Sequence, residues 1–84
     1  MTDEQIHAAF AEIVRDVLGS PSLELTPETV ASDVEGWDSL NHLYIVVEVQ
    51  RRFDIKINTS EIEDVRNVEE LVRLVSRKLR DSGS

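Results

Sequence analysis

Glu35-Gly36-Trp37-Asp38-Ser39-Leu40-Asn41-His42-Leu43 is the stretch that organises this chain, because a loop ends within it and the most apolar segment begins. Asp38 is a good helix N-cap, since its carboxylate can accept hydrogen bonds from the free amides of the first turn. We therefore expect Ser39 at or just inside a helix start, facing solvent. A helix start carries roughly half a positive charge and readily holds a phosphate. The Ser39 hydroxyl is well placed to carry a phosphodiester.

Gly36-Trp37-Asp38-Ser39-Leu40 has the form Gly-x-Asp-Ser-Leu and resembles the attachment motif of acyl and peptidyl carrier proteins. The central place of the motif in 84 residues and the later segment Phe53-Asp-Ile-x-Ile57 support the resemblance, which covers roughly residues 3 to 80. The resemblance implies that Ser39 carries 4′-phosphopantetheine, whose thiol holds acyl or aminoacyl groups as thioesters. On this interpretation Asp38 helps to position Ser39, and Leu40 docks the helix start into the core.

The same resemblance implies partners. These are a phosphopantetheinyl transferase, which uses coenzyme A, and the enzymes that load and process the acyl or aminoacyl group. The carrier itself would have no catalytic activity. Carriers of general fatty acid synthesis typically place several acidic residues after the serine, but this chain has Asn41, His42 and Tyr44 there. We therefore expect a stand-alone carrier for a polyketide, modified fatty acid or aminoacyl pathway, with partner enzymes contacting Asn41, His42, Leu43 and Tyr44.

The composition limits the classes of function. A chain of 84 residues is one domain, expected to span 1–80, with residues 81–84 as a disordered tail. It has no cysteine, so a disulfide, a thiolate zinc site or a catalytic thiol is excluded, and any thioester sulfur must come from a cofactor. The net charge of -8 argues against nucleic acid and anionic membranes as partners. It favours basic protein partners, and we expect a monomer.

The sequence contains no candidate for a membrane span or a secretory signal. The longest uninterrupted apolar run is Leu43 to Val47, whereas a span needs about 20 residues. No basic region precedes an apolar one at the N-terminus. The expected location is the cytoplasm.

Apolar spacing predicts a first helix that begins after Thr2, which has capping-box spacing with Gln5, and that stops at Gly19. Residues 20–38 form a long connection, which in a small domain usually has a function. Within it, Thr26-Pro27-Glu28 can start one helical turn, since proline suits the first helical position. Trp37 is expected to be a partly buried anchor of this loop.

A second helix is predicted over 39–53. Its β-branched residues suit a strand, but the length and the cap favour a helix. Apolar residues nearly surround it, so it should be central; one face holds Leu40, Leu43, Val47 and Gln50. Apolar side chains left exposed near Ser39 would be available to an acyl chain or a partner.

Two further helices complete the predicted fold. A short third helix lies within 58–66, where Ser60 and Glu63 have capping-box spacing. Asn67 and Glu70 cap a fourth helix with an apolar stripe. The predicted fold class is all-α, a small four-helix bundle of three longer helices and one short third helix, with a long first loop.

Asp38, Ser39 and His42 are also the three residue types of a hydrolase triad. Ser39 and His42 would be neighbours on one exposed helical turn, with nothing to orient the imidazole. The chain has no Gly-x-Ser-x-Gly elbow around this serine. A hydrolase is the third alternative, and turnover of an ester substrate would reveal it.

Asp33, Glu35 and Asp38 suggest a calcium loop, but an EF-hand needs a glutamate at its twelfth position, and counting from Asp33 that position is Tyr44. We expect no metal site. The main alternative to a carrier is an acidic helical interaction module that binds a basic partner and is never modified. Modification of Ser39 separates these two possibilities.

Overall fold

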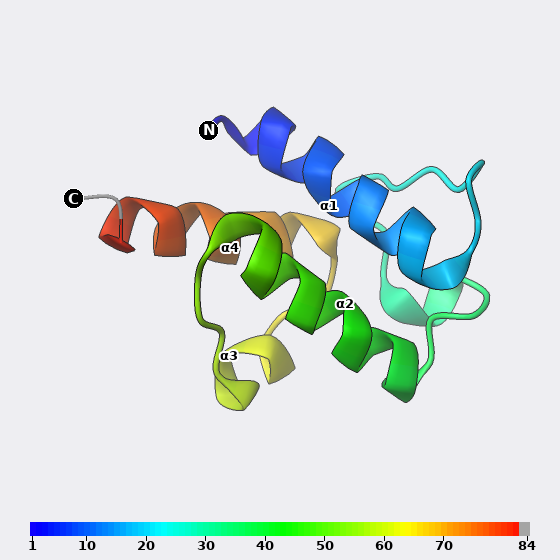
Figure 1. The fold of residues 1–84 in the computed structure, drawn as a ribbon. Helices are drawn as coiled ribbons and strands as arrows, with labels where there is room; N and C mark the ends of the chain where they lie inside the picture. Colours follow the sequence, from blue (N-terminus) through cyan, green and yellow to red (C-terminus); the bar gives the residue numbers. More distant parts are fainter. Residues whose placement is uncertain (83–84) are drawn as a thin grey trace.

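The computed structural model describes residues 1–82, which fold as helices joined by loops, without a strand (Figure 1). The elements in chain order are α1 (Asp3–Leu18), a short 3-10 turn η1 (Ala31–Asp33), α2 (Ser39–Phe53), α3 (Thr59–Glu63) and α4 (Val68–Ser82). The predicted all-α bundle is confirmed, including its short third helix and its long first loop. The bounds predicted for the second helix agree with α2.

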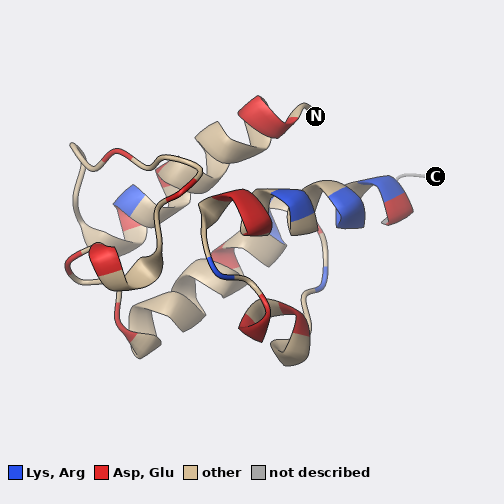
Figure 2. Ribbon diagram, turned by 180° about the vertical axis from the view of Figure 1, so that it is seen from behind, with Lys and Arg blue, Asp and Glu red and all other residues tan. Residues whose placement is uncertain are grey.

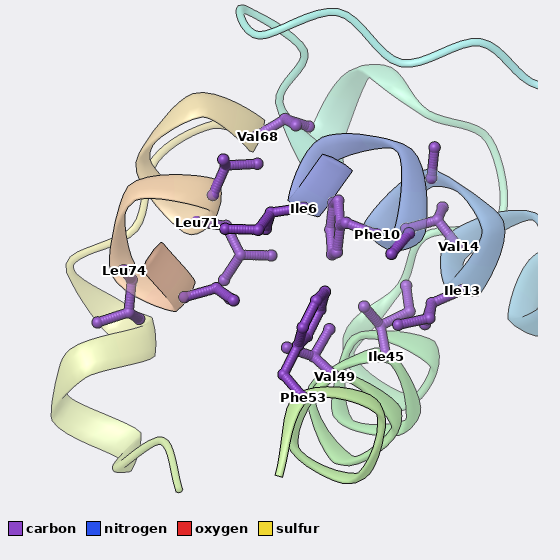
Figure 3. Close-up of a cluster of buried hydrophobic side chains, with 14 of the residues drawn as sticks. Ile6, Phe10, Ile13, Val14, Ile45, Val49, Phe53, Val68, Leu71 and Leu74 are labelled. Atoms are coloured by element: carbon purple, nitrogen blue, oxygen red, sulfur yellow. The ribbon is translucent and has the colours of Figure 1, made fainter. Parts of the chain in front are cut away.

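The core lies where α1 faces both α2 and α4. Figure 3 shows Phe10 of α1 pointing into the space between Val49 of α2 and Leu71 of α4. These side chains are buried, and no residue in the buried class of the described chain is polar or charged. Removing apolar surface from water is the dominant favourable term in folding, so this three-helix contact holds the molecule together.

The two ends of α1 follow from local sequence signals. The Gln5 amide donates to Thr2 Oγ1 at 3.2 Å, and the Thr2 amide donates to Gln5 Oε1 at 2.8 Å. Gly19 ends the helix with φ 64°, a left-handed conformation that glycine adopts without steric cost. The predicted capping box and the predicted stop are both confirmed.

The loop 20–38 is fastened to the helices through its carbonyl groups. His7 Nε2–H of α1 donates to the Leu25 carbonyl at 3.0 Å. The amide of Val68, the first residue of α4, donates to the Thr29 carbonyl at 2.9 Å. The first amides of a helix lack partners within that helix, and the loop satisfies two of them, because the Glu69 amide also donates to the Pro27 carbonyl at 2.9 Å. The loop is therefore part of the packed structure.

The 3-10 helical turn of this loop lies at η1. At Thr26-Pro27-Glu28, where a helical turn was predicted, the chain makes only a single turn, closed by the Thr29 amide donating to the Thr26 carbonyl at 3.1 Å. The Thr29 hydroxyl also accepts from the Thr26 amide at 2.9 Å. Such local bonds from side chain to backbone compete with helix formation, which explains the difference.

The third and fourth helices require two corrections to the prediction, one at the start of α3 and one at the end of α4. The cap of α3 is Asn58, whose amide donates to Glu61 Oε1 at 2.9 Å, and not the predicted Ser60–Glu63 box. Asn67 Oδ1 accepts from the Glu70 amide at 2.9 Å, as predicted for the start of α4. Helix α4 continues to Ser82, so residues 81 and 82, predicted to lie in a disordered tail, are helical. Residues 83 and 84 of that tail lie outside the described residues.

Leu40 is the main error in the predicted core, since it is 59% exposed. The buried residues of α2 are Ile45, Val49 and Phe53, spaced four apart. At 3.6 residues per turn, Leu40 lies about 140° around the helix from Ile45. The helix has two apolar faces, and its neighbours in the chain cover only one of them. Apolar spacing alone could not identify which of the two faces is buried.

Acidic residues dominate the surface, with 17 Asp and Glu against 9 Lys and Arg. In Figure 2 red acidic positions occur in the loops, on the short helix α3 and in the first turns of α1 and α4, while blue basic positions gather toward the end of α4. Lys78 of α4 forms an ion pair with Glu61 of α3 at 2.8 Å. The hydrogen bond from Lys78 holds the pKa of Glu61 below its ordinary value.

We predict that truncating a core residue costs far more stability than truncating Leu40. Phe10→Ala and Leu71→Ala should each lower the free energy of unfolding by roughly 2–5 kcal/mol, because both side chains are buried. Leu40→Ala is the matched control and should change it by less than about 1 kcal/mol. Urea unfolding followed by circular dichroism measures all three. Equal losses at Leu40 and Leu71 would contradict the packing described here.

We also predict that moderate salt stabilises the fold. Carboxylates repel one another across this small acidic surface, and added ions screen exposed charges over about 10 Å at 0.1 M ionic strength. The thermal unfolding midpoint should therefore rise between about 10 mM and 200 mM sodium chloride. Potassium chloride serves as the control for an effect specific to sodium. A midpoint that falls with either salt would be inconsistent with net repulsion.

Candidate functional site

Ser39 is the first residue of α2 and is exposed to solvent. Asp38 precedes it as the N-cap, with an extended backbone, and its Oδ1 accepts from the Asn41 amide at 2.8 Å. The His42 amide donates to the Asp38 carbonyl at 2.8 Å. Within the described chain, the amides of Ser39 and Leu40 have no hydrogen-bond partner. The serine hydroxyl thus stands beside free N–H groups at the positive end of the helix, an arrangement that fits a phosphate ester.

The loop before Ser39 turns sharply at Gly36. Its φ is 88°, in the region that favours glycine, so a side chain at this position would strain the backbone. The Gly36 carbonyl accepts two hydrogen bonds, from the Asp38 amide at 3.0 Å and from the Asn41 side-chain Nδ2 at 2.8 Å. Asn41 therefore joins the first turn of α2 back to the turn that precedes it.

Trp37 anchors this loop, as its residue type predicts. It is half-buried, and its ring lies 6.1 Å, centroid to centroid, from the core residue Phe10. Its indole Nε1–H donates to His42 Nδ1 at 3.1 Å, and the two rings are 6.2 Å apart. Sequence reasoning missed this pairing. A tryptophan and a histidine on either side of a helix cap were the only available signal.

His42 is held in its neutral form by this geometry. Nδ1 accepts the indole proton, so the imidazole carries its own proton on Nε2. Burial lowers the pKa of His42 from its ordinary value of 6.5. The folded chain then binds fewer protons at this site than the unfolded chain. The stability that His42 contributes is present above pH 6.5 and is lost as the pH falls toward the lower folded pKa.

A small apolar cavity lies behind Trp37 and His42. Its volume is about 50 Å³, and its walls include Ile45 and Val49 of α2 and Leu71 of α4. A space of this size holds only a few heavy atoms. Sequence reasoning did not find this cavity, because residues of α1, the first loop, α2, the α3 region and α4 all contribute to its walls.

One face of α2 leaves apolar side chains in solvent. Leu40, Leu43, Tyr44 and Val47 are exposed by 59%, 62%, 54% and 48%, and we call them the α2 apolar face. Their spacing makes one stripe along the helix, beginning beside Ser39. Figure 2 shows α2 without charge over its first half, in agreement with the sequence from residue 39 to 47.

The structure separates the four residues predicted to contact partners. Leu43 and Tyr44 are exposed on the α2 apolar face. Asn41 and His42 are half-buried, and their polar atoms bond to Gly36 and Trp37 within the chain. Val47, which the prediction omitted, belongs to the exposed stripe.

The arrangement is not that of a hydrolase triad. Within the described residues Ser39 and His42 share no hydrogen bond, and the Asp38 carboxylate bonds the Asn41 amide instead of an imidazole. The described chain also holds no group of three or more His, Cys, Asp or Glu placed to bind a metal ion. None of its described helices has the length and apolar character needed to cross a membrane.

Comparison with known proteins agrees with this site. A family model described as "Phosphopantetheine attachment site" matches residues 8–75. The chain is 34% identical over 79 residues to an acyl carrier protein of Exiguobacterium, covering 94% of this chain and 100% of that protein. It is 31% identical over 77 residues to the meromycolate extension acyl carrier protein of Mycobacterium tuberculosis, covering 92% of this chain and 67% of that protein.

A solved structure supports the same assignment. The fold is similar to that of a holo acyl carrier protein from Geobacter metallireducens, with a TM-score of 0.84 and 36% sequence identity. That match covers 90% of this chain and 87% of the other. The cofactor of this family is 4′-phosphopantetheine, attached covalently, and the exposed serine beside free amides fits it. The chain belongs to the acyl carrier protein family.

Proposed function

We propose that Ser39 is the attachment site and that the chain carries acyl or aminoacyl groups as thioesters on its 4′-phosphopantetheine arm. One observation carries this proposal: Ser39 is an exposed serine at the first position of α2, directly after a capping aspartate. Transfer from coenzyme A would form a bond between Ser39 Oγ and phosphorus and release adenosine 3′,5′-bisphosphate. The hydroxyl proton would leave to a base of the transferase. The arm supplies the thiol that the cysteine-free chain lacks.

The chain's own residues have limited tasks in this function. Asp38 holds the first turn, and the free amides of Ser39 and Leu40 stabilise the negative phosphodiester. The protein shuttles cargo between enzymes, and these enzymes perform the chemistry. We propose that it acts as a monomer in the cytoplasm. Its charge of -8 supports the monomer, because two copies repel each other.

A phosphopantetheinyl transferase with coenzyme A should add one phosphopantetheine group to the wild-type chain. Ser39→Ala should gain none and keep its fold, because an exposed serine contributes little to packing. Ser60→Ala is a matched control, being an exposed helical serine elsewhere, and should be modified like the wild type. Intact mass spectrometry gives the result, and circular dichroism checks the fold.

An unchanged mass of the wild type, beside a control carrier that is modified, would reject the proposal. It would then favour the alternative of an unmodified acidic module that binds a basic partner. Turnover of an ester substrate that is lost in Ser39→Ala would favour a hydrolase.

We further propose that the pathway is specialised, of polyketide, modified fatty acid or aminoacyl type. Its support is the first half of α2, where the docking residues next to Ser39 carry no acidic charge. Enzymes that select acidic helices should read such a face poorly, because mismatched charges weaken encounter and register. Relatives named as meromycolate extension carriers agree with this proposal, while relatives named only as acyl carrier proteins leave it open. Leu43 and Tyr44 are the proposed partner contacts, and Asn41 and His42 lie beside them.

General fatty acid synthesis enzymes should load and elongate this carrier more slowly than their own. The double substitution Leu43→Glu and Val47→Glu should raise those rates, since it places acidic charge on the exposed face without breaking a hydrogen bond within the chain. Ser22→Glu with Ser60→Glu adds the same charge at exposed positions outside α2 and should leave the rates low. Steady-state kinetics of the holo proteins measures the effect. Equal rates for this carrier and the enzymes' own would contradict a specialised pathway.

A further inference from the structure

Whether Ser39 is presented correctly depends on a short piece of backbone that has little burial of its own. Residues 35, 36, 38 and 39 are all exposed, and only Trp37 in this segment is half-buried. Gly36 has a φ of 88°, and glycine can also adopt many other backbone conformations that other residues avoid. Something must therefore fix the angle at which the loop enters α2, and two side chains from the first turn of the helix do so.

Asn41 makes the first of these links. Its backbone amide donates to the Asp38 carboxylate, and its side-chain Nδ2 donates to the Gly36 carbonyl, both at 2.8 Å. One residue thus bonds to the loop on both sides of Trp37. The Ser39 backbone thus lies between the Gly36 carbonyl, to which Asn41 bonds, and the first turn of α2.

His42 makes the second link. Its Nδ1 accepts from the Trp37 indole at 3.1 Å, and Trp37 in turn packs on Phe10, which is 1% exposed. The loop is therefore tied through His42 to α2 and through Phe10 to α1. Loss of the His42 acceptor would leave a half-buried indole N–H without its partner, and that is costly.

We propose that Asn41 and His42 are positioning residues for the modification of Ser39. Their side chains bond to Gly36 and Trp37, and these two bonds fix the backbone that presents the Ser39 hydroxyl to the phosphopantetheinyl transferase. The inference rests on the proposed function of Ser39 as the attachment site. It gives Asn41 and His42 a task within the chain, separate from contacts with downstream enzymes.

The His42 link requires a neutral imidazole, so it should weaken in acid. Phe10 of α1 lines the same cavity as His42, and Arg66 is the charged side chain among the described residues of that lining. The Asp38 carboxylate at the cap is engaged by the Asn41 amide. Protonation of Nδ1 removes the acceptor for Trp37, and the loop then keeps only the Asn41 link to α2.

The test measures kcat/KM of the transferase for the apo chain at pH 7.5. His42→Leu and Asn41→Ala should each lower it roughly three- to tenfold, the range for one lost hydrogen bond that controls geometry. Trp37→Phe keeps the aromatic packing but removes the indole donor, so it should reproduce the loss in His42→Leu. The double variant Trp37→Phe with His42→Leu should lose little more than either of these single variants, because both substitutions remove the same bond.

Two variants separate positioning from general stability. His42→Asn keeps an acceptor near Nδ1 without a titrating group, and it should restore most of the rate. Asn67→Ala removes a helix-cap bond of the same kind at α4, so it should lower the melting temperature and leave modification unchanged. Relative to His42→Asn, the wild type should become a poorer substrate as the pH falls toward the folded pKa of His42, which burial places below 6.5. Dividing the kcat/KM of the wild type by that of His42→Asn at each pH removes the transferase's own pH dependence.

A readout without the transferase completes the test. In NMR spectra of the apo wild type, the Trp37 indole N–H resonance should shift as the pH is lowered, and this shift should be absent in His42→Asn. The backbone amides of residues 36–40 should exchange their hydrogens with solvent faster in His42→Leu than in the wild type.

A kcat/KM equal to that of the wild type in folded His42→Leu, Trp37→Phe and Asn41→Ala would overturn the inference while leaving Ser39 as the site. A rate loss in Asn67→Ala equal to that in Asn41→Ala would also overturn it. A wild type that gains no mass would instead reject the proposed function, and this inference with it.

Discussion

The contact between Phe10 and Trp37 joins the hydrophobic core to the loop that precedes Ser39. Phe10 belongs to the core between α1, α2 and α4, while Trp37 belongs to the loop that leads into α2. A small domain has little core to spare, and here part of it is used to fix a loop. The start of α2 is thereby held against the bundle from both sides, through its own buried face and through the indole.

Local chemistry explains which parts of the fold the sequence predicted well. Thr2 with Gln5, Gly19 and Asp38 each act within one helical turn, so their effect is visible in a few consecutive residues. The bounds of α2 followed from its cap and from the length of the apolar segment. Ser39 at the helix start followed in the same way.

The parts that were missed depend on distant neighbours. Leu40 and Ile45 are equally apolar, and only the placement of the other helices decides which of them is buried. The bonds from Asn41 and His42 to the loop need the left-handed turn at Gly36, which a pattern of residue types does not reveal. The cavity behind Trp37 likewise depends on how segments distant in the sequence meet. Sequence spacing therefore predicted the elements, both ends of α1 and α2 and the start of α4, and the structure was needed for the cap of α3, the end of α4 and the way the elements are joined.

Trp37 is the only tryptophan of the chain, and it lies against the imidazole of His42 at the start of α2. Its ultraviolet emission is therefore a built-in optical probe of this one region, free of background from other indoles. An imidazolium quenches indole emission more strongly than a neutral imidazole does, and a wetter surrounding shifts the emission to longer wavelength. Fluorescence can thus follow the environment of the loop in real time, in dilute solution and without an attached dye, as the carrier meets each of its enzymes.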